Sequence, residues 1–180
     1  METLKAIELR RSIRSYLRKT VEDDKIGQLL AAGNNAPKAG YFHISVIENT
    51  DVLNEINDRA LFSYKNSGDK LLMGRAAVEG YQPLYGAPVL FLFSAPMANP
   101  YNAANTSCAA ANITIAATAL GLGSCYILSP LLGIKGNTEL IKKIGIPFGY
   151  SPVCGVVVGY SSGDTLSTSN SIVDNINFCK

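Results

Sequence analysis

The 180-residue chain is poor in the side chains that build metal centres and hydrolytic sites. It contains one histidine, His43, and its four cysteines form no Cys-x-x-Cys pair. Because zinc sites draw on closely spaced cysteine and histidine ligands, no metal site is expected. His43 falls in a strand pattern, where a lone histidine is more typical of a structural residue than of a general base. We therefore expect no catalytic side chain of these kinds.

Several nucleotide and nucleophile motifs are also absent. The chain has neither a Gly-x-x-x-x-Gly-Lys-[Ser/Thr] phosphate loop nor a Gly-x-Ser-x-Gly turn. Gly121-Leu-Gly123 lacks the third glycine of a dinucleotide fingerprint and follows a helix pattern, so it indicates a helix end. The formal net charge of +2 is too small to indicate a nucleic-acid partner.

No charged residue occurs between Asn99 and Ile134. A membrane span needs about 18 consecutive apolar residues, and polar residues and glycines interrupt this stretch. The pattern favours instead a helix buried on all sides inside a protein. The polar N-terminus and the cysteine pattern indicate neither a signal peptide nor disulfides, so we expect a cytoplasmic protein with no membrane segment.

The periodicity predicts one α+β domain over residues 1–180. Helices are expected to begin near Leu4, Thr20, Asn49, Ala103 and Thr138, and strands to cover 42–47, 87–94, 124–128 and 152–160. The second helix is expected to open with a capping box formed by Thr20 and Asp23, and the last with an Asn137 cap. The expected architecture is a three-layer, α/β/α-like domain. It has a mixed central sheet of four to five strands, flanking helices and a long buried central helix.

Two segments fall outside the regular pattern. Residues 63–86 lose their periodicity and predict an irregular, partly helical excursion of the kind that shapes binding sites. The tail, 161–180, is rich in serine and asparagine but ends in apolar residues. We expect it to pack on another surface, such as a second subunit.

The most concentrated charge lies in Arg10-Arg-Ser-Ile-Arg-Ser-Tyr16, where three arginines and two serines fall within six residues. If a loop follows the first helix here, Arg10 and Arg14 could converge on one anion together with the Ser12 hydroxyl. The alternative is a solvated basic turn. The rest of the chain offers few candidate acids, bases or metal ligands. An anion-binding site in such a chain is typical of a protein in which a phosphate-bearing organic cofactor carries out the chemistry. It suits a binding protein equally well.

Five stretches, in order along the chain, resemble motifs of the FMN-dependent nitroreductases. They are the arginine stretch, the Ala36-Pro37 turn, Tyr85-Gly-Ala-Pro88 before an apolar strand, Ser107 to Tyr126, and Ile146 to Tyr160. The resemblance implies the nitroreductase-like fold and a homodimer with FMN at the subunit interface. It implies an oxidoreductase in which NAD(P)H delivers hydride to flavin N5, for ping-pong transfer to a small electron-poor acceptor such as a nitroaromatic or quinone.

The resemblance also implies a set of cofactor-binding residues. The FMN phosphate and ribityl chain would be held by Arg10, Arg11, Ser12 and Arg14. The flavin would be approached from the other subunit by Pro37, Lys38 and Ala39. The backbone near the N5 edge of the flavin would come from Leu128 and Ser129. The family often carries a basic pair after its last strand, but residues 166–170 contain no cation. The arginines and Ser12 are therefore expected to hold the phosphate largely by themselves.

Two other interpretations remain open on the sequence. The same fold could host another flavin reaction, such as flavin reduction, dehalogenation or enoate reduction. The chain could also be a flavin-binding or sensor protein without turnover.

Overall fold

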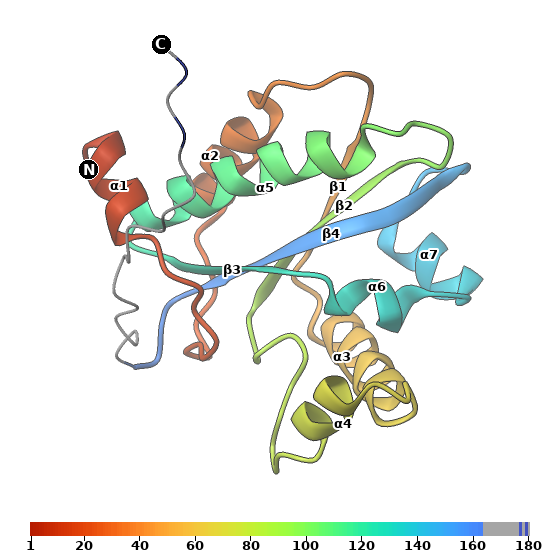
Figure 1. The fold of residues 1–180 in the computed structure, drawn as a ribbon. Helices are drawn as coiled ribbons and strands as arrows, with labels where there is room; N and C mark the ends of the chain where they lie inside the picture. Colours follow the sequence, from red (N-terminus) through yellow and green to blue (C-terminus); the bar gives the residue numbers. More distant parts are fainter. Residues whose placement is uncertain (164–176, 178, 180) are drawn as a thin grey trace.

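A computed structural model describes residues 1–163 together with Asn177 and Cys179. The elements are α1 (Thr3–Leu9), α2 (Asp23–Asn34), β1 (His43–Ile47), α3 (Thr50–Lys65), α4 (Lys70–Ala76), β2 (Val89–Pro96), α5 (Asn102–Ala119), β3 (Gly123–Ile127), α6 (Ser129–Ile134), α7 (Thr138–Ile144) and β4 (Tyr150–Gly159). Figure 1 shows their arrangement. The predicted tail falls almost wholly outside the described residues. No helix in the described part combines the length and apolar content that a membrane crossing requires.

The four strands form one sheet in the order β1-β2-β4-β3. The number of strands agrees with the prediction, but the prediction of a mixed sheet is wrong: each pairing between these strands is antiparallel. The connection from β1 to β2 is long enough for a parallel crossover. It contains both α3 and α4, however, and the chain re-enters the sheet in the reverse direction.

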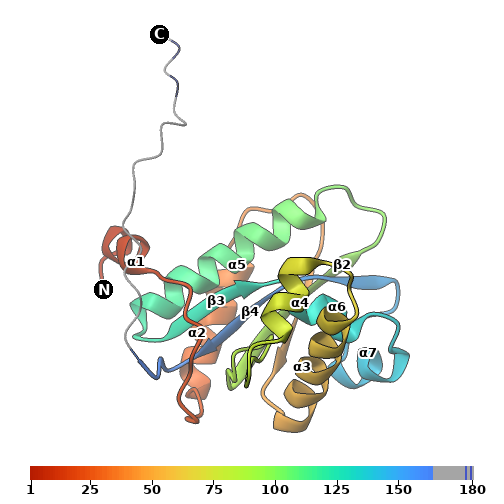
Figure 2. The same ribbon diagram turned by 60° about the horizontal axis from the view of Figure 1, so that its bottom comes forward.

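Helices cover both faces of the sheet, as the three-layer prediction requires. α2 and α5 pack together on one face, while α3, α6 and α7 lie on the other (Figure 2). β2 is buried on both faces because its side chains alternate between the two cores. Leu90 and Leu92 enter the core under α3, and Phe91 and Phe93 enter the core under α5.

The central helix α5 is buried along one side only, so the prediction of burial on every side is wrong for the single chain. Its exposed side carries small residues, among them Ala104, Ser107 and Ala111, and no charge. The lack of charged residues in α5 therefore has two sources, the side of the helix that is buried in the core and an exposed side that carries no charged residue.

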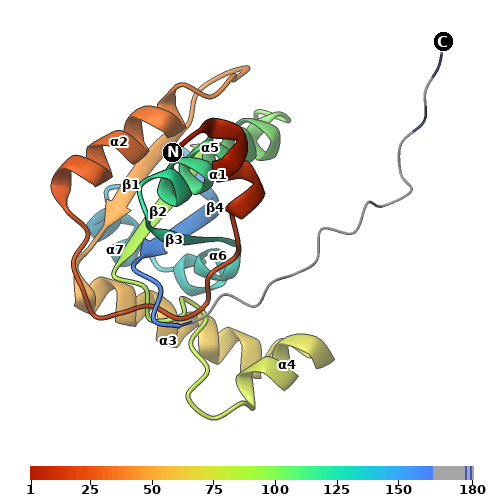
Figure 3. The ribbon, with the colours of Figure 1, turned by 90° about the vertical axis from the view of Figure 1, so that its left-hand side faces the viewer.

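The excursion over 63–86 contains more regular structure than its composition suggests. α3 continues to Lys65, and α4 follows after a short turn in which Asp69 accepts hydrogen bonds from the Leu71 and Leu72 amides. Figure 3 shows α4 projecting beyond α3, away from the sheet. The remaining residues, 77–88, form successive turns that lead into β2.

Candidate functional site

Residues Arg10 to Tyr16, here called the arginine loop, leave α1 and run along the start of β3. The Ile13 amide donates to the Ser124 carbonyl at 2.9 Å, within an isolated parallel bridge between Ser12 and Ser124. Ile13 and Tyr16 are buried, whereas Ser12 and Arg14 are exposed. The loop therefore fixes its apolar side chains inward and presents its polar side chains at the surface beside β3.

A second set of contacts fixes the far end of the loop and ties it to the residue that follows β4. The Tyr16 hydroxyl donates to the Ile13 carbonyl at 2.8 Å, and the Leu17 amide donates to the Tyr160 carbonyl at 2.8 Å. Gly123 allows the close approach of the loop, because a Cβ at this position would lie 2.8 Å from Ile13 Cγ1. The path of the loop thus depends on residues more than a hundred positions away.

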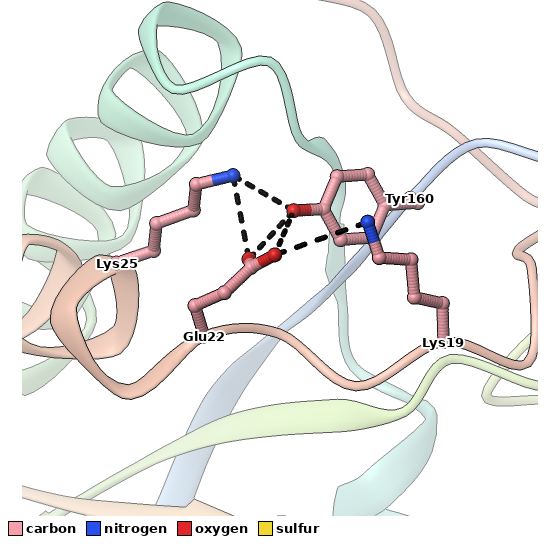
Figure 4. Close-up of polar contacts among 4 residues, drawn as sticks. All are labelled: Lys19, Glu22, Lys25 and Tyr160. Carbon is pink, nitrogen blue, oxygen red and sulfur yellow. Dashed lines mark hydrogen bonds and ion pairs between the residues drawn. The ribbon is translucent and has the colours of Figure 1, made fainter.

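Just beyond the loop, a cluster of four side chains joins the start of α2 to the end of β4; we call it the Glu22 cluster (Figure 4). The Tyr160 hydroxyl donates to the Glu22 carboxylate at 2.6 and 2.8 Å and accepts from Lys25 Nζ at 2.7 Å. Lys19 Nζ lies 3.9 Å from the Tyr160 ring centroid. The hydrogen bond from Tyr160 is the main reason that the pKa of Glu22 falls to about 2.

The buried thiol of Cys125 in β3 lies within the electrostatic influence of Arg10, Ser12 and Arg14. Burial raises the pKa of Cys125, while the charge of Arg14, a hydrogen bond with Ser12 and the charge of Arg10 act in the opposite direction. The charges of Arg10 and Arg14 and the hydroxyl of Ser12 thus act on the same part of β3, and their joint binding of one anion stays a prediction. Arg11 instead donates to the carbonyls of Glu8 at 2.7 Å and Arg10 at 2.8 Å, at the end of α1.

The predicted N5-edge residues lie at the other end of β3. An extended strand places Leu128 about 13 Å from Ser124. Leu128 is 54% exposed, whereas Ser129 is buried and its hydroxyl donates to the Pro83 carbonyl at 2.8 Å. The Ser129 hydroxyl is thus already used in a hydrogen bond within the chain, and the exposed surface at this end of β3 comes from Leu128.

The third predicted segment, Pro37 to Ala39, does not reach the arginine loop in a single chain. The Ala39 amide donates to Asn105 Oδ1 at 2.8 Å, and Asn105 Nδ2 donates to the Ala39 carbonyl at 3.0 Å. Asn105 belongs to the first turn of α5, whereas the loop passes the end of α5 near Thr118. At 1.5 Å per residue these two points of α5 are about 20 Å apart.

A cleft of roughly 700 Å³ opens on the α3 side of the sheet, between the 15–21 segment, the start of α3 and the 82–89 segment. Its lining includes Tyr16 and Tyr85. The sequence indicated that residues 63–86 shape a binding site but singled out no residue there. Tyr85 has a φ of 58°, which no sequence pattern signals for a tyrosine.

The described elements define an α+β protein with a cationic loop at the edge of a four-stranded antiparallel sheet. Residues 7–160 match the model of the nitroreductase family. The chain belongs to this family. A relative from Archaeoglobus fulgidus, named provisionally as an NADH dehydrogenase/NAD(P)H nitroreductase, is 30% identical over 168 residues. The match covers 88% of this chain and 85% of the relative.

Solved structures show the same fold. A nitroreductase with bound FMN from Bacteroides fragilis superimposes with a TM-score of 0.89 at 30% identity, covering 100% of both chains. A nitroreductase with bound FMN from Desulfitobacterium hafniense gives a TM-score of 0.91 at 22% identity, again over 100% of both chains. The nitroreductase-like fold inferred from the sequence motifs is therefore confirmed.

Proposed function

We propose that the protein is an FMN-dependent oxidoreductase that takes hydride from NAD(P)H and passes it to an electron-poor acceptor such as a nitroaromatic or quinone. The observation that carries the proposal is the anchoring of the arginine loop along the start of β3, with Ser12 and Arg14 exposed, in a member of the nitroreductase family. The FMN in the two solved structures and the name of the archaeal relative support the choice of cofactor and reductant. Bound FMN would supply the hydride chemistry.

The residues along β3 fit an elongated ligand with an anionic end. Arg10, Ser12 and Arg14 would bind the phosphate through charge-assisted hydrogen bonds. The exposed residue Leu128, about 13 Å along the strand, would position the ring end. Ser129 would contribute only backbone, since its hydroxyl already donates to Pro83. The chain's task is then binding, orientation and access, which agrees with the scarcity of candidate acids and bases.

We also propose that the working form is a homodimer. The Pro37 to Ala39 segment and the arginine loop lie at opposite ends of α5, so both contribute to one site only if a second copy packs along α5 in the opposite direction. The exposed uncharged side of α5 supports such packing. So do Leu4 and Ile7 of α1, which are 79% and 49% exposed.

The visible spectrum of the purified protein, before and after NADH or NADPH is added without oxygen, tests the proposed function. We expect a flavin band that bleaches with one or both nucleotides. A band that persists with both would favour a binding or sensor protein. No band after reconstitution with FMN would overturn the proposal.

Arg14→Ala tests the phosphate site. Loss of one charge-assisted contact should raise the Kd for FMN about 10- to 100-fold. Lys135→Ala is the control, because it removes an exposed positive charge that follows α6 and lies outside both the arginine loop and the cleft. Equilibrium dialysis of FMN against both variants gives the comparison, and equal retention by the Arg14 variant would remove Arg14 from the site.

A further inference from the structure

Three tyrosines pack together on the α3 side of the site; we call them the phenol cluster. The rings of Tyr64 and Tyr81 are stacked, with centroids 6.3 Å apart and planes 25° apart. Tyr85 meets Tyr81 edge to face, with centroids 6.3 Å apart and planes at 81°. Tyr64 comes from α3, while the other two precede β2, so the fold rather than the local sequence brings them together.

The phenol cluster is linked to residues near both ends of β3. At one end, Tyr85 and Tyr16 line the same cleft, and Tyr16 lies near both Cys125 and Arg14. At the other end, the Ser129 hydroxyl donates to the carbonyl of Pro83, which lies between Tyr81 and Tyr85 in the sequence, and it also lies beside the Tyr64 hydroxyl. The cluster therefore borders the path along which a ligand would connect the arginine loop with Leu128.

The backbone holds Tyr85 in an unfavourable conformation. Its φ of 58° is left-handed, which is rare for a bulky residue. The turn is fixed by the Tyr85 amide, which donates to the Gln82 carbonyl at 2.9 Å, and by the Leu84 amide, which donates to Asn57 Oδ1 at 3.2 Å. Strain of this kind persists where the surroundings impose it, commonly at binding sites.

The chemistry of the cluster suits an electron-poor ring. Burial and the neighbouring phenols of Tyr85 and Tyr64 raise the pKa of Tyr81 to about 12, so this hydroxyl stays protonated at neutral pH. Tyr81 and Tyr85 are only partly buried, unlike Tyr64. Their ring faces are electron-rich, which favours offset stacking with an electron-poor aromatic ring.

We propose that Tyr81 and Tyr85 are specificity-determining residues that bind the acceptor, stacking against its electron-poor ring and donating a hydrogen bond to its nitro or carbonyl oxygen. This inference rests on the proposed function. It names the residues that select the acceptor at the site bordered by Leu128.

Calorimetric titration of the oxidised, FMN-loaded protein with 4-nitrobenzyl alcohol, in the absence of reductant, tests the inference without turnover. We expect Tyr81→Leu to raise the Kd about 3- to 10-fold and Tyr81→Phe, which keeps the ring, about 3-fold. Tyr85→Phe should behave like Tyr81→Phe. In turnover, the KM for the acceptor should rise while kcat stays near that of the unmodified protein.

Two controls make the result specific. Tyr101→Phe removes the hydroxyl of a 59% exposed tyrosine outside the cluster and should leave the Kd unchanged. Benzyl alcohol, which lacks the nitro group, should bind the unmodified protein and the Tyr81 variants equally weakly. If Tyr81→Leu does not fold, the conservative phenylalanine variants decide the question.

The outcomes separate the two proposals because FMN retention is measured first. Unmodified protein that does not bind FMN overturns the proposed function and this inference with it. Protein that binds FMN and bleaches with NAD(P)H, yet whose Tyr81 and Tyr85 variants bind 4-nitrobenzyl alcohol as tightly as the unmodified protein, overturns this inference alone.

Discussion

Gly123 lies at the contact between β3 and the arginine loop, where there is no room for a side chain. We predict that Gly123→Ala lowers the free energy of unfolding by about 1–3 kcal/mol, because the new Cβ would overpack against Ile13. A Cβ at this position lies 2.8 Å from Ile13 Cγ1. Since Ile13 separates Ser12 from Arg14, the same change should also weaken FMN binding. Urea denaturation and FMN dialysis measure the two effects.

Gly27 provides the matched control in the interior of α2. A Cβ there meets no atom within 4 Å, so Gly27→Ala should stabilise the protein by about 0.5–1 kcal/mol through helix propensity. FMN affinity should not change. Equal stability of the Gly123 variant and the unmodified protein would show that the loop can move away from β3 without cost.

At this scale the sequence predicts short-range features well and long-range ones poorly. α1 ends at Leu9, so the arginine stretch leaves the helix as a loop, and the Asn137 side chain caps α7 as expected by accepting from the Leu140 amide. The turn of Arg11 toward the carbonyls of α1 and the left-handed Tyr85 depend on where the surrounding chain runs. No residue pattern encodes either one.

Among the elements, the Glu22 cluster joins α2 to β4 next to the arginine loop. Tyr160→Phe removes the hydroxyl that is the main cause of the low pKa of Glu22. Because the pKa is about 2 in the folded protein and 4.5 ordinarily, this contribution to stability is present above pH 4.5 and is lost as the pH falls toward 2. The Tm difference between the unmodified protein and the variant should therefore shrink over this pH range.

Thermal denaturation at several pH values between 2 and 7 gives the measurement, with Tyr41→Phe as the control. Tyr41 is 77% exposed and lies outside the cluster, so its variant should show no pH-dependent difference. A Tm difference for Tyr160→Phe that stays constant from pH 6 to pH 2 would contradict the assignment of the effect to Glu22.

The same cluster explains one incorrect prediction about a helix start. The capping box of Thr20 and Asp23 is wrong, since α2 begins at Asp23 with Glu22 as its N-cap residue and no side-chain cap. Glu22 instead accepts a hydrogen bond from Tyr160, 138 residues away.

α6 was not predicted at all, because six residues are too few for a periodic signal. It packs on α3 through Gly133, where a Cβ would contact the Ile56 carbonyl.

At the scale of the whole molecule, the order of the four strands and the longer helices and the three layers were predictable because apolar periodicity reports burial on each element. Strand direction was not, since periodicity does not reveal how a long connection returns to the sheet. The assembly of the candidate site is still harder to predict from the sequence. Its proposed parts, the arginine loop and the Pro37 to Ala39 segment, lie about 20 Å apart along α5, so a single chain presents only one part at each end.

A charge on the exposed side of α5 tests whether a second copy completes the site. Ala111→Glu places a carboxylate where the proposed homodimer buries an uncharged face, and burying an unpaired charge is strongly unfavourable. We expect sedimentation analysis to show mostly monomer, with FMN affinity at least 10-fold weaker because the second copy's segment is lost. Ala31→Glu, at an exposed alanine of α2, should leave both properties unchanged. A monomeric Ala111→Glu variant that retains full FMN affinity would show that one chain holds the cofactor alone, and the Pro37 to Ala39 segment would then have no part in binding it.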